Sequence, residues 1–137
     1  RCRVNLFLYI LYFRQNLQNC ERIVLVTATV GLDVDRLITK YSHIAPSRAV
    51  MLQAAGAAAV ESLLDAFCNE LTEEGLSLRQ RFSCGYGDLP LSIQKDIFNA
   101  LDCPKSIGVS LTDSFLMTPT KSVSAIIGID GGFNDRP

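Results

Sequence analysis

The chain has 137 residues, of which 48% are hydrophobic and 20% are charged, with 13 basic and 14 acidic side chains. This length fits one domain over residues 1–137. The high apolar content and the small numbers of Gly, Pro and Cys exclude a disordered, collagen-like or disulfide-scaffold protein. A net charge of −1 gives no electrostatic reason to expect nucleic acid or an anionic membrane as a partner.

The cysteine and histidine content excludes the common metal sites. The five cysteines include no C-x-x-C pair, and His43 is the only histidine, so we expect no metal. Scattered single cysteines are typical of the reducing cytoplasm, where we place the protein. The apolar run at residues 5–13 (NLFLYILYF) is too short to span a membrane and lacks a cleavage site, which favours a buried segment over a targeting signal.

The first half of the chain contains the clearest periodic patterns. Residues 6–17 can form a central helix, with a buried strand as the alternative, and residues 21–30 (ERIVLVTATV) predict a strand covered on both faces. Asp33 is expected to cap a helix that runs through Ser42. The longest helical pattern extends from Pro46–Ser47 to about Glu73, and its expected core stripe consists of Leu52, Ala55, Ala59, Leu63, Phe67 and Leu71.

The second half mixes a loop, a helix and strands. Residues 76–89 lack periodicity and predict an ordered loop, after which Pro90 begins a helix to about Leu101 that stops at Cys103-Pro104. Residues 110–117 and 122–129 are β-prone stretches that predict a hairpin. We therefore predict an α+β fold in which a long helix and further helices pack on a mainly antiparallel sheet.

Two carboxylates stand out on the long helix. Glu61 and Asp65 are four positions apart, so both side chains project from one helix face. Like charges at this spacing destabilise a helix by roughly a few tenths of a kcal/mol, which a nearby cation or ligand donor would relieve. A solvated acidic face is the alternative interpretation.

The loop at residues 79–90 (RQRFSCGYGDLP) has the residue types of a small-molecule site. Arg81 offers a planar fork of donors for a carboxylate, Gly85 permits close backbone approach, and Tyr86 supplies a ring and a hydroxyl. The alternative is a glycine turn with a packed tyrosine and a surface arginine. Cys84 beside this turn is a weaker candidate, as a reactive thiol.

Three segments resemble one known family. Residues 81–90 are similar to the R-P-A-x-G-Y-P-x-x-P segment of the activation (reactivation) domain of cobalamin-dependent methionine synthase. Residues 107–119 (IGVSLTDSFLMTP) resemble its I/T-G-x-x-L-T-E-S-x-x-M-x-P segment, and residues 122–124 match its S-V-S. Residues 61–71 resemble, more loosely, the long helix before the loop.

The resemblance implies a domain that binds S-adenosylmethionine and supports reductive remethylation of cob(II)alamin. By position, Arg81 would hold the carboxylate of the ligand's methionine part, and Asp65, with Glu61 as the backup, would receive its ammonium group. The backbone at Ser83 and Gly85 would line the site. The remaining expected binding residues are Tyr86, which would border the ligand and the corrin, and Ser122 and Ser124, which share a strand face and would contact ligand or face water.

The resemblance also implies partners. The chain lacks the D-x-H-x-x-G motif, so cobalamin would be carried by a methionine synthase domain or subunit, and the electron would come from a flavodoxin-like donor. No side chain is expected to act as a catalytic acid or base. Gly87 replaces a family proline and Thr118 an aromatic residue, and the family domain is longer at both ends. We therefore expect a trimmed domain of the stand-alone or split-subunit type, with a docking module that does not bind S-adenosylmethionine as the alternative.

Overall fold

The computed structural model describes residues 17–87 and 89–130. The elements in these ranges are β1 Cys20–Thr29, α1 Leu32–Ile44, α2 Pro46–Glu73, the 3₁₀ turn η1 Leu91–Ile93, α3 Gln94–Leu101, α4 Cys103–Ile107, β2 Ser110–Leu111, β3 Met117–Thr118 and β4 Ser122–Asp130. Apart from its last residue, the helix expected over residues 6–17 lies outside the described part of the chain, as does the apolar run at residues 5–13.

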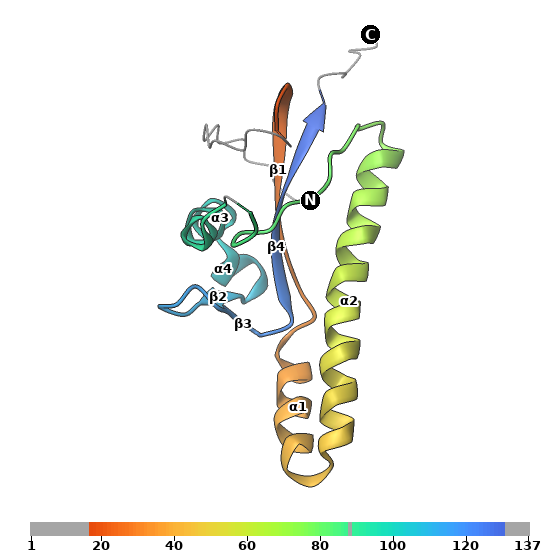
Figure 1. Cartoon of the computed structure of the whole chain (residues 1–137), viewed down its shortest axis with the longest axis vertical. Coiled ribbons are helices and arrows are strands. Elements are labelled where there is room, and N and C mark those ends of the chain that lie inside the picture. Colours follow the sequence, from red (N-terminus) through yellow and green to blue (C-terminus); the bar gives the residue numbers. More distant parts are fainter. Residues whose placement is uncertain (1–16, 88, 131–137) are drawn as a thin grey trace.

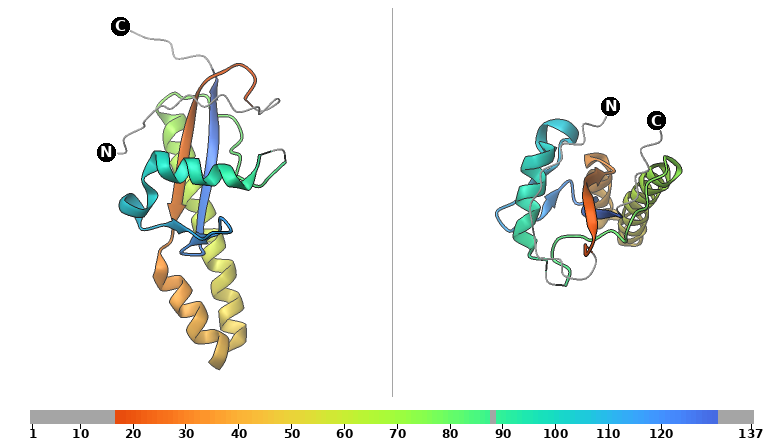
Figure 2. Two further views of the ribbon diagram at one scale, coloured as in Figure 1. Left: turned by 90° about the vertical axis from the view of Figure 1, so that its left-hand side faces the viewer. Right: turned by 90° about the horizontal axis from the view of Figure 1, so that it is seen from above.

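The two long strands form the centre of the fold. β1 and β4 pair antiparallel, with Val24 opposite Ile127 and Val26 opposite Ala125. Figure 1 and the view from above in Figure 2 show α2 along one face of this sheet and α3 along the other. A second, short antiparallel pair joins β2 to β3. The predicted α+β class is confirmed, as is the prediction of a strand at residues 21–30 that is covered on both faces.

Alternation along the strands produces two separate apolar clusters. Toward α2, Val24 and Ile127 pack with Phe67 and other residues of the helix. Toward α3, the neighbouring strand residue Ile126 packs with Ile97. Even-numbered residues of β4 therefore face α3 and odd-numbered residues face α2, which determines the face on which any functional side chain must lie.

The long helix has the predicted bounds, but its buried face is rotated from the predicted one. The residues that it buries are Ala49, Gly56, Val60 and Leu64. Of the predicted stripe, Phe67 and Leu71 do pack against the core, whereas Ala55, Ala59 and Leu63 are exposed. The reason lies in α1, which packs on the stripe that contains Gly56. A Cβ at this position would lie 3.1 Å from Cγ1 of Val34, closer than an ordinary van der Waals contact, so glycine allows α1 to pack tightly on this stripe.

α1 and α2 pack side by side, and their joined ends extend beyond the sheet (Figure 1). Asp33 does not cap α1 as predicted: the N-cap is Gly31, and Asp33 forms an ion pair with Arg36 within the first turn. Asp35 instead accepts hydrogen bonds from the backbone N–H of Thr120 at 2.7 Å and from its hydroxyl at 2.5 Å. This contact fixes α1 against the turn between β3 and β4.

α2 is long and apolar enough to cross a membrane, judged by length and composition alone, and it is the one helix of the described ranges that passes this test. The core helices of soluble proteins pass the same test. This helix therefore does not by itself indicate a membrane protein.

The last third differs from the predicted hairpin. Residues 110–117 split into β2 and β3 because the chain reverses between them, where the N–H of Phe115 bonds to the carbonyl of Thr112. β4 pairs with β1 rather than with this stretch. The helix predicted from Pro90 ends at Leu101, but the expected stop at Cys103-Pro104 is the start of the short helix α4.

Candidate functional site

The segment after α2 runs along the outer edge of β4 and so acts as a partial third strand. Leu78 forms a bridge with Ile129 and Phe82 with Ile126. Between these two bridges lie three residues of the loop segment but only two residues of β4. The segment therefore carries one extra residue, as in a β-bulge. Phe82 packs toward α3, and Arg81 beside it projects to the opposite face, toward α2.

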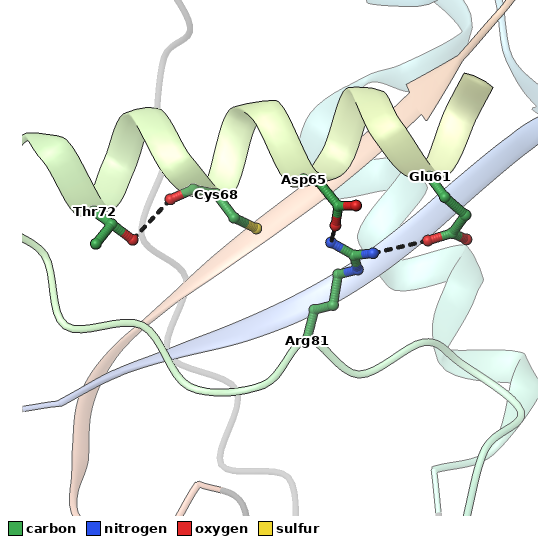
Figure 3. A network of polar contacts seen from close by, with 5 residues as sticks. All are labelled: Glu61, Asp65, Cys68, Thr72 and Arg81. Atoms are coloured by element: carbon green, nitrogen blue, oxygen red, sulfur yellow. Dashed lines mark hydrogen bonds and ion pairs between the residues drawn. The ribbon is translucent and has the colours of Figure 1, made fainter. Parts of the chain in front are cut away.

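Arg81 is held by two carboxylates of α2. Its Nη1 lies 2.5 Å from Oδ1 of Asp65, and its Nη2 lies 2.9 Å from Oε2 of Glu61. Figure 3 shows the guanidinium beneath the helix with one nitrogen directed at each carboxylate. The spacing of Glu61 and Asp65 on one helix face, predicted from the sequence, thus places both within reach of a single fork of donors. We call these three residues the Arg81 cluster.

The environment stabilises the charged form of Arg81. The hydrogen bond to Asp65 is the largest cause that raises the pKa of Arg81, partial burial opposes it, and further contributions come from the Asp65 charge, the Cys68 side chain and the Glu61 charge. Cys68, drawn beside Asp65 in Figure 3, is a contact that the sequence analysis missed. It lies seven positions after Glu61 and so on the same helix face, which is the signal that could have found it.

Beyond Arg81 the chain makes a compact turn. The N–H of Gly85 donates to the carbonyl of Leu89 at 2.9 Å, and the N–H of Tyr86 donates to the carbonyl of Ser83 at 3.3 Å. Gly85 has a φ of 88°, a left-handed conformation that favours glycine, so this position depends on its lack of a side chain. The Tyr86 residue is 73% exposed, which leaves its ring open to a ligand or partner.

Ser122 and Ser124 lie on β4, where both are engaged within the fold. The hydroxyl of Ser124 donates to Oε1 of Gln94 at 3.3 Å, and this contact places it on the α3 face, opposite the Arg81 cluster. The hydroxyl of Ser122 bonds to the carbonyl of Pro119 at 2.6 Å and to Oγ1 of Thr29 at 2.9 Å. No hydrogen bond or ion pair between described residues joins either serine to Arg81, and their assignment to a ligand stays a prediction.

Cys84 is buried, and burial raises the pKa of its thiol to about 11. A protonated, enclosed thiol is a poor nucleophile, so the geometry argues against a reactive Cys84. Within residues 17–87 and 89–130, no three His, Cys, Asp or Glu side chains are grouped to hold a metal ion. The polar chemistry of the loop therefore centres on Arg81.

Comparisons with known proteins point to one family. The model of the family "Vitamin B12 dependent methionine synthase, activation domain" matches residues 68–130. Among solved structures, the MetH reactivation domain bound to AdoHcy matches with a TM-score of 0.66 and 23% identity, over 77% of this chain. The chain spans 38% of the length of that structure. Comparison with curated protein sequences gave no match.

The structural likeness confirms the fold, and the family match includes Arg81, the glycine turn and β4. Glu61 and Asp65 lie just before the matched segment and are joined to it by the ion pairs of Arg81. The resemblance predicted from the sequence is therefore confirmed over residues 68–130, where this chain matches the model of the vitamin B12 dependent methionine synthase activation domain.

Proposed function

We propose that the chain is a reactivation module that binds S-adenosylmethionine at the Arg81 cluster and presents its methyl group to a cobalamin-carrying partner. The observation that carries the proposal is the meeting of one guanidinium and two carboxylates beside a glycine turn. The related structure contains AdoHcy, the demethylated form of the same ligand, which supports this ligand class.

The charges of the cluster fit an amino-acid head group. A guanidinium has five N–H donors, and the two ion pairs engage Nη1 and Nη2, so Arg81 can also receive a ligand carboxylate. Asp65 and Glu61 are partly exposed and can accept hydrogen bonds from an ammonium group. The cluster thus offers a partner to each charge of a zwitterion.

The glycine turn supplies the rest of the site in this proposal. The backbone at Ser83 and Gly85 would line the ligand, and the exposed ring of Tyr86 would separate it from the corrin. Cobalamin, bound to the partner, would accept the methyl group, and a flavodoxin-like protein would supply the electron. The role of this chain is to position the methyl donor, because holding two reactants in the correct geometry can by itself remove a large part of the activation barrier of a reaction.

Isothermal titration of the full chain with S-adenosylmethionine tests the proposal. We expect Arg81→Ala to weaken binding about ten- to a hundredfold, because a charge-assisted contact contributes about 1.5–3 kcal/mol. Arg36→Ala is the matched control, since Arg36 lies on α1 in an exposed ion pair with Asp33 and should leave affinity unchanged. Absence of binding by the wild-type chain, or equal binding by Arg81→Ala, would contradict the assignment.

One observation favours a second candidate. Arg81 already has two anionic partners, as in an arginine that only fastens a loop to a helix, and Gly87 stands where the family has proline. A docking module that keeps the scaffold but not the ligand site would show both features. Capture of a purified cobalamin-carrying methionine synthase fragment together with null titrations of S-adenosylmethionine would favour this candidate.

A further inference from the structure

We infer that the Arg81 cluster selects the positively charged sulfonium ligand over its neutral thioether product, and that Glu61 is the residue that sets this selectivity. The inference rests on the proposed function and adds to it a discrimination between S-adenosylmethionine and S-adenosylhomocysteine. It starts from the charge balance of the cluster, which holds one guanidinium and two carboxylates and so carries one surplus negative charge.

Among the described residues, neither Arg79 nor Lys121 forms an ion pair with the Arg81 cluster. Arg79, two positions before Arg81, is paired with Asp130 at 2.6 Å. Lys121 lies against α2 at Gly56, where its Cγ would be 3.0 Å from an added Cβ, so its stem packs more than one helical turn from Glu61. The surplus charge on this stretch of α2 is therefore not cancelled by these neighbours.

The two carboxylates are not equivalent. Asp65 makes the shorter contact, and its hydrogen bond is the largest cause of the raised pKa of Arg81, whereas the Glu61 charge is the smallest. Arg81 and Asp65 thus form a neutral pair that holds the guanidinium in place, and Glu61 supplies the surplus. Removing the Glu61 charge should leave the site assembled and electrically neutral.

The two ligands differ by one charge. Both carry the same zwitterionic amino-acid group, and only S-adenosylmethionine also carries a positive sulfur. When the methyl group is transferred, the electron pair of the carbon–sulfur bond stays on sulfur, and the sulfonium becomes a neutral thioether. A surplus carboxylate attracts the ligand before this step and not after it, so the reaction itself would weaken binding and favour product release.

The size of the effect follows from exposure. The side chain of Glu61 is 54% exposed, so water and salt screen its field. Charges several ångströms apart in such surroundings change affinity by about three- to tenfold, and added salt reduces the effect. The selectivity is therefore expected to be modest and to depend on ionic strength.

The test is titration of the full chain with both ligands at low and high salt. We expect wild type to bind S-adenosylmethionine more tightly than S-adenosylhomocysteine. Glu61→Gln should reduce that ratio about three- to tenfold, mainly by weakening S-adenosylmethionine. Glu70→Gln, which removes an exposed carboxylate further along α2, should keep the wild-type ratio. Circular dichroism checks that each variant is folded.

The outcomes separate this inference from the function on which it rests. Binding of neither ligand to wild type would overturn the proposed function and this inference with it. Equal affinity for both ligands in wild type, or a wild-type ratio in Glu61→Gln, would overturn the inference alone. An equal fall in the ratio for Glu70→Gln would also refute it, because the selectivity would then come from the general charge of the helix.

Discussion

Leu63 and Leu64 are adjacent on α2 and provide a matched test of the face that this helix buries. Leu64 is 1% exposed, whereas Leu63 is 48% exposed. Replacing a buried leucine by alanine costs about 2–5 kcal/mol, because apolar contacts are lost and a cavity remains. At the half-exposed position less apolar area is lost and alanine is the better helix former, so we expect a cost of about 1 kcal/mol or less.

Urea unfolding monitored by circular dichroism measures both free energies of unfolding. For a chain of this size the melting temperature should also fall by roughly 4 °C per kcal/mol, so Leu64→Ala should be clearly less heat-stable than Leu63→Ala. Equal losses, or a larger loss for Leu63→Ala, would refute the rotated helix face. Such a result would also undermine the Arg81 cluster, because Glu61 and Asp65 are directed by the same rotation.

Two further predictions concern buried polar groups. Gln94→Leu should lower the free energy of unfolding by roughly 1–3 kcal/mol in urea titrations, because the Ser124 hydroxyl and the Phe115 carbonyl lose their partner; an unchanged stability would contradict this bridging role. For Cys84, burial raises the pKa from 9.0 to about 11, so the folded thiol stays protonated where the unfolded one ionises. The unfolded state then binds fewer protons, and stability should fall as pH rises from about 9 to about 11. Urea titrations across this range should show the fall in wild type to be steeper than in Cys84→Ala, and parallel curves would argue against it.

The elements with strong local patterns could be predicted from the sequence. The β-branched run that ends at Gly31 indicates β1, and the unbroken helical pattern after Pro46 indicates α2, because both depend on neighbouring residues alone. The partner of β4 could not be predicted, since β1 and the stretch at residues 110–117 are both β-prone. The buried face of α2 was also ambiguous, because alanines and leucines form two stripes one residue apart.

The candidate site was predictable in its parts but not in its assembly. The fork of Arg81 and the shared face of Glu61 and Asp65 follow from residue type and spacing. Their direct contact depends on the path of the segment after α2 along β4, where this segment has one residue more than β4 between the two bridges. No sequence pattern predicts such an irregularity. The contribution of Cys68 depends on the same arrangement.

The pairing of β1 with β4 also has a consequence for the order of folding. The hydroxyls of Thr29 and Ser122 are hydrogen-bonded between the two strands, although these residues are 93 positions apart in the chain. The pairing of β1 with β4 therefore closes a loop that contains the four helices of the described part. α1 and α2 are neighbours in sequence and can associate early, whereas a contact of such long range forms late. During synthesis on a ribosome, β1 would stay unpaired with β4 until β4 had emerged. A chain that stopped before residue 122 would lack the strand along which Arg81 is positioned, so the site would form only once synthesis has passed β4.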